Sequence, residues 1–201
     1  MTSWGPVPVL LGQILPHALW AVALVLLVAS LGCIAATLQA PRRLLVYCAT
    51  GLLAAAFVIV LNPGQQAPLV YRVLIGITVL ALAALGGWPA SQLVLALATR
   101  SSTRPSPHDG ILVPALTAEG ETTTREVLRG GTTIGVLERL AAAGTIMAGF
   151  PEGLAVLIAI KGVGRFTELA EAEARERFII GTLTSIIWAC ACAGIFLIVT
   201  G

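Results

Sequence analysis

The feature that most constrains this chain is a series of apolar runs, each long enough to cross a membrane as a helix. A helix needs about 20 apolar residues to cross the ~30 Å hydrocarbon core of a bilayer. Hydrophobic residues make up 57% of the 201 residues and charged residues only 11%, whereas about 25% of the residues of soluble domains are charged. The sequence therefore predicts an all-α, polytopic transmembrane helical bundle of about six spans, with no sizeable soluble domain.

The apolar runs fall into two three-span halves on either side of a polar loop. In the N-terminal half, residues 1–99, we expect an irregular lead-in up to residue 16, because prolines are frequent there. The spans of this half are expected at 18–38, 44–61 and 69–85. Gly86-Gly87-Trp88-Pro89 should break the third run and leave a short helix at 90–99. After the loop at 100–130, the C-terminal half, 131–201, should span at 132–149, at 154–166 with a polar helical extension to 177, and at 178–199.

The positions of the basic residues predict which way the chain faces. Nine of the twelve Lys and Arg residues lie in the connections at 41–43, 100–130 and 165–177. Cytoplasmic connections of membrane proteins carry an excess of Lys and Arg. We therefore expect these three connections in the cytoplasm and both termini outside a plasma membrane. A chain rich in Ala, Leu and Arg with a single Lys further suggests a bacterial source.

Several classes of function lack support in the sequence. The net charge is +2 and its cations are dispersed, so we expect no nucleic-acid partner. The four cysteines lie in apolar runs without a C-x-x-C pair, and the two histidines stand far apart, so no metal site and no cofactor are predicted. Nucleotide-binding, zinc-protease and serine-hydrolase motifs are absent from the sequence, so no catalytic residue is predicted. The expected partners are the lipid bilayer and either a membrane-protein partner or a second copy of the chain.

Charged residues inside the last three apolar runs form the candidate site. A charge at the centre of a membrane helix costs about 2.5–3.5 kcal/mol on translocon scales, so such residues are normally paired or functional. The fourth and fifth spans should form a hairpin around Pro151, which places residues at similar distances from Pro151 at similar depth. Glu138 lies on a face of small residues and should therefore point at a helix. The expected ion-pair network is Glu138, Lys161, Arg165 and Glu168.

Two interpretations of this cluster remain open. In the structural one, the network fixes the register of the hairpin. In the functional one, excess cations form an inner-leaflet pocket for an anionic ligand, either a small anion or a lipid head group; its expected residues are Arg139, Lys161, Arg165, Thr182 and Ser185. Arg139 should turn away from Glu138 toward Glu168, Glu176, a lipid phosphate or water. A third hypothesis, a lipid-modifying transferase, would use Glu138 as its base.

Three blocks in this region resemble an uncharacterised family of small bacterial integral membrane proteins. They are Gly135-Val136-Leu137-Glu138-Arg139, then Lys161-Gly162-Val163-Gly164-Arg165-Phe166-x-Glu168, and then Glu176-x-x-Ile179-Ile180-Gly181-Thr182-Leu183-x-Ser185. The family patterns are I-G-x-L-E-R, A-K-x-x-x-R-F-x-E and A-E-x-x-L-I-G-T-L-x-S. This chain departs at Ile160, where the family tends to have Ala. The resemblance implies that these positions act together, and it implies no particular activity.

Overall fold

The fold was analysed in a computed structural model that describes residues 7–61, 67–98, 112–116, 122–126, 131–164 and 172–201, with side chains at 17–61, 67–98, 131–164 and 175–201. These residues form six helices and one two-stranded antiparallel hairpin. In chain order the elements are α1 Val7–Gln39, α2 Arg43–Val60, α3 Leu69–Ala98, β1 Leu112–Leu116, β2 Thr122–Glu126, α4 Gly131–Met147, α5 Gly153–Gly164 and α6 Ala172–Thr200.

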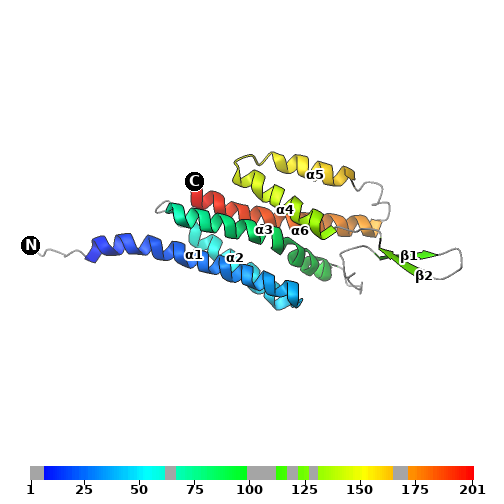
Figure 1. The fold of residues 1–201 in the computed structure, drawn as a ribbon, viewed down its shortest axis with the longest axis horizontal. Helices are drawn as coiled ribbons and strands as arrows, with labels where there is room; N and C mark the ends of the chain where they lie inside the picture. Colours follow the sequence, from blue (N-terminus) through cyan, green and yellow to red (C-terminus); the bar gives the residue numbers. More distant parts are fainter. Residues whose placement is uncertain (1–6, 62–66, 99–111, 117–121, 127–130, 165–171) are drawn as a thin grey trace, which may run out of the picture.

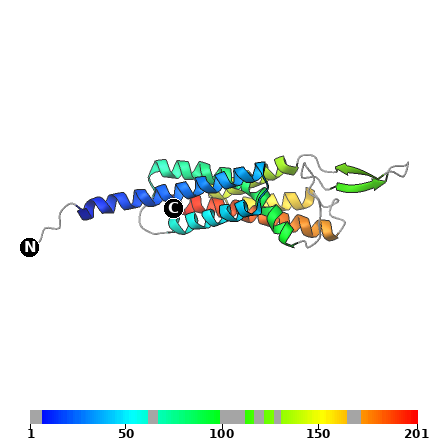
Figure 2. The same cartoon turned by 90° about the horizontal axis from the view of Figure 1, so that it is seen from below.

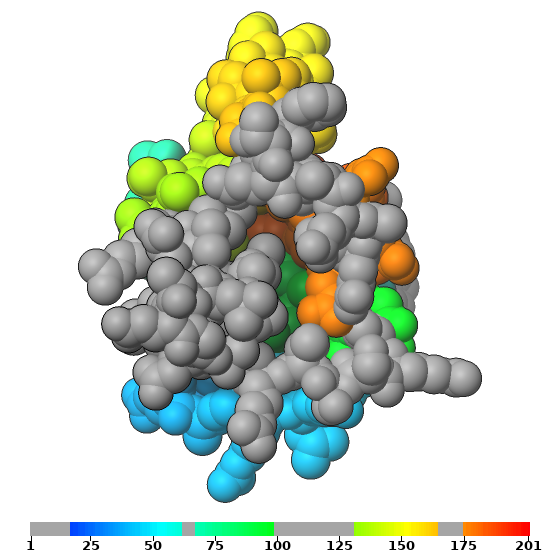
Figure 3. Space-filling view, turned by 90° about the vertical axis from the view of Figure 1, so that its right-hand side faces the viewer, coloured from blue at the N-terminus to red at the C-terminus, as the bar shows by residue number. Residues whose placement is uncertain are grey.

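The helices lie roughly along one axis, with α3 and α6 at the centre of the bundle (Figures 1 and 2). The α1–α2 pair covers one side of this central pair, and α4 covers another. Among the described elements, α5 packs mainly against α4, and it stands out from the bundle in Figure 3 (yellow) on the side away from α1 and α2. The N-terminal end of α1 and the C-terminal end of α6 lie at the same end of the bundle (Figure 1).

Small and branched apolar side chains make up the core, while large apolar side chains also cover the outside. Leu27, Ile75, Leu82 and Ile195 are fully buried between the helices. On the outer surface, Leu44, Val58, Leu69 and Val163 expose between 68% and 78% of their area. A bundle that is apolar both inside and outside is expected when lipid rather than water surrounds it.

Four helices of the described chain are long and apolar enough to cross a membrane: His17–Gln39 of α1, all of α2, all of α3 and Arg175–Thr200 of α6. The all-helical membrane-type fold is therefore seen, apart from the hairpin of β1 and β2. Because α4 has 17 residues and α5 has 12, they extend about 25 and 18 Å at 1.5 Å per residue. The described residues accordingly show four candidate spans.

Four boundaries differ from the expectations drawn from the sequence. Residues 7–16 belong to α1, so the lead-in is not irregular there. The polar residues 172–177 begin α6 instead of extending α5. Helix α3 continues through Pro89 without a break, although its last turns lean away from the axis of the rest (Figures 1 and 2). Within the loop at 100–130, Leu112 pairs with Glu126 and Leu116 with Thr122.

A tight turn joins α4 to α5 and sets the relative depth of their charged residues. Gly149 adopts a φ of 76°, a conformation that glycine reaches without strain. Its N–H donates to the Ile146 carbonyl at 3.0 Å, and the N–H of Phe150 donates to the Thr145 carbonyl at 2.8 Å. This is a Schellman ending of α4, and Pro151 follows it. The residues of the turn itself, Gly149 and Pro151, therefore end α4 and produce the hairpin that the sequence predicts.

Candidate functional site: a polar junction of three helices

Arg139 is the only buried charged side chain of the described residues, and it lies where α3, α4 and α6 meet. Its exposed fraction is 6%. The Nε atom donates to the Ala84 carbonyl of α3 at 2.8 Å, and Nη1 donates to the Ser185 hydroxyl of α6 at 3.2 Å. One guanidinium thus connects α4 to both central helices. We call Arg139, Ser185 and the α3 segment 84–88 the polar junction.

Two glycines on α3 make room for this arrangement. A Cβ atom at Gly87 would lie 2.2 Å from Cδ of Arg139 and 3.0 Å from Oγ of Ser185. A Cβ atom at Gly86 would lie 2.4 Å from the indole of Trp188. Small residues let membrane helices approach closely. Only glycine therefore fits at both positions without a shift of the neighbouring side chains.

Side chains of α3, α4 and α6 donate to backbone carbonyl groups around Pro89. Proline has no N–H group and weakens the helical hydrogen-bond ladder at its own position. Trp188 Nε1 donates to the Leu82 carbonyl at 2.9 Å, and Ser91 Oγ donates to the carbonyls of Gly87 and Gly181 at 2.8 and 3.0 Å. The carbonyls of Leu82, Ala84 and Gly87 on α3 thus accept side-chain bonds from α6, α4 and α3 itself. The carbonyl that loses its helical partner at Pro89 is a different one, that of Leu85.

Trp88, in the same stretch of α3, presents a donor that the described structure does not satisfy. Its Nε1 atom is buried and has no hydrogen-bond partner. A buried N–H group without an acceptor costs about 1–3 kcal/mol, so an unpaired one in a native protein calls for an explanation such as a bound ion or a water. Trp88 Nε1 is thus a donor for which the described protein atoms supply no acceptor.

A second charged contact lies between α4 and α5. Lys161 Nζ donates to Oε2 of Glu138, and the exposed fractions of the two side chains are 17% and 18%. The same ammonium lies 5.8 Å from the centre of the Phe178 ring of α6, close enough for a cation–π attraction. The ion pair holds α5 to α4, and the ring contact extends this cluster to the start of α6.

The candidate residues from the sequence thus divide between two places. Ser185 joins Arg139 in the polar junction, and Thr182 lies about one turn before it on α6, half-buried. Glu138 and Lys161 form the separate ion pair. Arg165 and Glu168 lie outside the described residues. Glu176 is exposed at the start of α6.

Of the partners expected for Arg139, water or a lipid phosphate at the surface is not the one it meets, because its side chain turns into the bundle. The reason is that Gly87 on α3 and Gly135, one turn earlier on α4, have no side chain, and the Arg139 side chain occupies the space that a Cβ atom would fill at each of them. Glu168, another expected partner, lies outside the described residues. Sequence reasoning took Gly86 and Gly87 as signs of a helix break and did not assign Trp88 or Trp188 to the site. The Gly-Gly pair inside an apolar run was the signal that could have indicated a close helix crossing.

No protein-family model, curated protein or solved structure matches the chain. The resemblance drawn from the three sequence blocks therefore stays a prediction. The structure places the first block on α4 and the whole of the third on α6.

The chemistry that these residues can perform is limited by their types. No group of three His, Cys, Asp or Glu side chains that could hold a metal ion occurs among the described residues. In the polar junction, the Arg139 guanidinium donates to the Ala84 carbonyl and the Ser185 hydroxyl, and the indole N–H of Trp88 has no acceptor among the described residues. Such a set suits an acceptor-rich group such as a phosphate or a carboxylate.

Proposed function

We propose that this chain is a multi-pass protein of a bacterial plasma membrane that binds or transports an anionic ligand, either free or linked to a lipid. The ligand would enter from the cytoplasmic side, near Lys161 and Arg165, and reach the donors of the polar junction. The observation that carries this proposal is Trp88 Nε1, a buried donor without an acceptor, close in sequence to Ala84 and Gly87, which contact the buried Arg139.

Native mass spectrometry of the purified protein tests this function. We expect a retained anionic mass, and we expect it to disappear in Lys161→Met and Arg165→Met. Trp88→Phe removes one donor and keeps the ring, so binding of added phosphatidylglycerol or inorganic phosphate should weaken roughly five- to tenfold, as for one hydrogen bond of about 1 kcal/mol. Comparing the lipid with free phosphate shows which of the two sources the site accepts.

Arg42→Met is the matched control, because it removes an exposed cation at the start of α2 and should leave the retained mass unchanged. Thermal stability is measured in parallel. An absence of retained mass and of binding to either probe, together with a loss of stability in Lys161→Met and Arg165→Met, would contradict ligand binding and support a purely structural ion pair.

A structural or assembly subunit of a membrane complex is the second candidate function. It is favoured by α5, which has no buried residue and packs mainly on α4 among the described elements. Small residues recur on its exposed surface at Ala155, Ala159 and Gly162; such faces often contact another helix in membranes. Failure to recover a partner or a second copy under mild detergent would count against this function.

The transferase hypothesis has less support than these two. Its base would be Glu138, which the structure holds in an ion pair with Lys161. The carboxylate oxygen that would have to take a proton from a substrate is thus already occupied by the Lys161 ammonium. A polar cavity beside Glu138, large enough for a donor and an acceptor substrate, would be needed to restore this hypothesis.

For topology we propose six crossings with both termini outside the cell. In a cysteine-free background, Ser102→Cys should be protected from an impermeant thiol reagent in intact cells. Glu152→Cys, in the exposed turn between α4 and α5, should be labelled if the hairpin crosses the membrane. Protection of both positions in intact cells would instead indicate four crossings and a hairpin that does not reach the outer surface.

A further inference from the structure

The last turns of α3, residues 91–98, form an arm that is packed less tightly than the rest of the helix. The buried residues of α3 lie between Ile75 and Ala90, and every side chain from 91 to 98 is exposed or half-buried. The arm leans away from the axis of the preceding turns and lies at the end of the bundle where α6 begins (Figures 1 and 2). Segments with few buried contacts open most easily, so the arm is the part of α3 that can move.

A hinge separates the α3 arm from the buried part of the helix. Pro89 has no N–H group, so the Leu85 carbonyl loses the donor that it would have in a regular helix. Gly86 and Gly87 precede this proline, and sharp bends in helices occur mostly at proline and glycine. On the buried side of the hinge, α3 is held by bonds from α4 and α6 to the carbonyls at 84 and 82. The arm can therefore swing while the rest of α3 stays in place.

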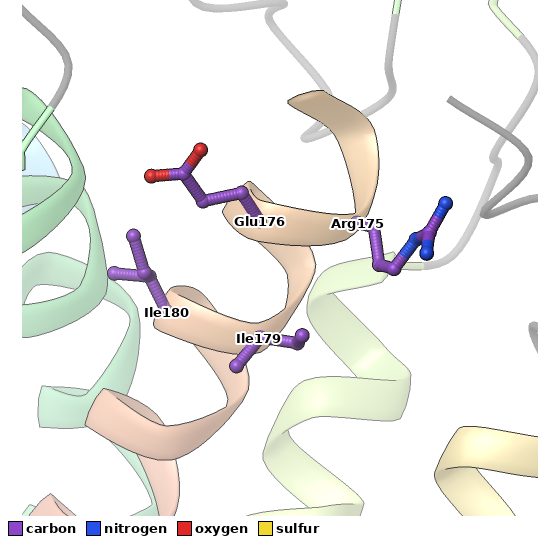
Figure 4. A pocket seen from close by; sticks show the side chains of 4 residues that line it. All are labelled: Arg175, Glu176, Ile179 and Ile180. Carbon is purple, nitrogen blue, oxygen red and sulfur yellow. The ribbon is translucent and has the colours of Figure 1, made fainter. Parts of the chain in front are cut away.

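One serine joins the α3 arm both to α6 and to the far side of the hinge. Ser91 Oγ donates to the Gly181 carbonyl of α6 at 3.0 Å and to the Gly87 carbonyl of α3 at 2.8 Å. Beside this bond, Cδ1 of Leu95 lies 3.7 Å from the position that a Cβ atom would take at Gly181, and Ile180 points from α6 toward α3 (Figure 4). A hydrogen bond between neutral groups contributes only modestly to stability, so this attachment can open and close.

The α3 arm meets α6 on the way to the polar junction. Gly181 lies four residues before Ser185 on α6, which is about 6 Å along the helix axis. The arm therefore contacts α6 between the junction and the end of the bundle at which the proposed ligand enters. Trp88, whose buried Nε1 atom has no acceptor among the described residues, lies within the hinge. Movement of the arm away from α6 would thus open the junction toward that end.

We propose that the α3 arm is a gate that controls entry to the polar junction. Residues 86–89 are its hinge, and the bond from Ser91 to the Gly181 carbonyl holds it in the closed position that the structure shows. When the arm swings away from α6, an anionic group such as a phosphate reaches Trp88 and the junction behind it. The gate rests on the proposed function, because it regulates access to the same site, but movement of the arm is measurable without a ligand.

Double electron–electron resonance measures this movement. With the other three cysteines replaced by alanine, spin labels are attached to the exposed native Cys48 of α2 and to Leu97→Cys in the arm. We expect two distances for this pair, and one distance for the reference pair of Cys48 with Ile77→Cys, which lies before the hinge. Ser91→Ala should increase the open population about two- to tenfold, the effect of one lost hydrogen bond. Pro89→Ala restores the helical donor and should leave the closed distance alone.

Entry of inorganic phosphate is measured in the same variants by tryptophan fluorescence after rapid mixing. Phosphate should bind about two- to tenfold faster to Ser91→Ala than to the unaltered protein, in proportion to the open population, and more slowly to Pro89→Ala. Thr78→Ala is the matched control. The Thr78 hydroxyl donates to the Leu74 carbonyl within α3, so its loss should change neither the distances nor the rate.

The outcomes separate the gate from the proposed function. A single distance for the arm pair in both the unaltered protein and Ser91→Ala would overturn the gate, as would a binding rate that does not follow the open population. Phosphate binding in either case would leave the proposed function standing. Two distances without phosphate binding by any variant would contradict the proposed function, and with it the role of the arm as a gate.

Discussion

Lys161→Met should lower the stability of the protein more than removal of any surface charge, because it leaves the Glu138 carboxylate without its ammonium partner. Removing one partner of a buried ion pair costs about 3–5 kcal/mol. Since these side chains are 17% and 18% exposed, solvent screens part of the interaction, and we expect about 2–3 kcal/mol. Thermal unfolding in detergent, followed by circular dichroism, measures the loss.

The double variant Lys161→Met, Glu138→Leu separates the ion pair from simple packing effects. Replacing both partners of a buried pair by apolar residues is often neutral or stabilising. The double variant should therefore recover most of the stability that Lys161→Met loses. If the double variant loses as much stability as the single variants Lys161→Met and Glu138→Leu lose when added together, a direct pairing of these side chains is contradicted.

Gly86→Ala should have the second large effect, because a single methyl group meets a rigid ring. Its Cβ would lie 2.4 Å from Cε2 and Nε1 of Trp188, so the indole must move and its bond to the Leu82 carbonyl is lost. Overpacking costs about 1–3 kcal/mol, and the hydrogen bond adds about 0.5–1.5 kcal/mol. The midpoint of unfolding and the tryptophan fluorescence should both change.

Two other helical glycines provide matched controls. A Cβ atom at Gly32 of α1 or Gly144 of α4 meets nothing within 4 Å. Since alanine favours a helix over glycine by up to about 1 kcal/mol, Gly32→Ala and Gly144→Ala should be neutral or slightly stabilising. If they destabilise as much as Gly86→Ala, the close approach of Trp188 to α3 is not the cause.

The membrane-type fold could be predicted from the sequence because apolar length and hairpin signals act locally. The second apolar run, expected at 44–61, is helical over Arg43–Val60, since a lipid environment leaves the backbone no better hydrogen-bond partner than its own helix. The turn at Gly149 and Pro151 is likewise set by the residues within it. Because the turn is short, the depth of Glu138 relative to Lys161 follows from counting residues.

The direction of a charged side chain depends on the neighbouring helices, so only the tertiary structure decides it. Arg139 turns inward because Gly87 of α3 leaves space and because Ala84 and Ser185 offer acceptors. Helix α3 also continues through Pro89, where the sequence Gly86-Gly87-Trp88-Pro89 predicts a break. The sequence by itself thus determined the lengths of the apolar runs and the depths of the charged residues, because both follow from counting residues. Only the tertiary structure decided the direction of the Arg139 side chain, because its partners lie on helices that are far away in the chain.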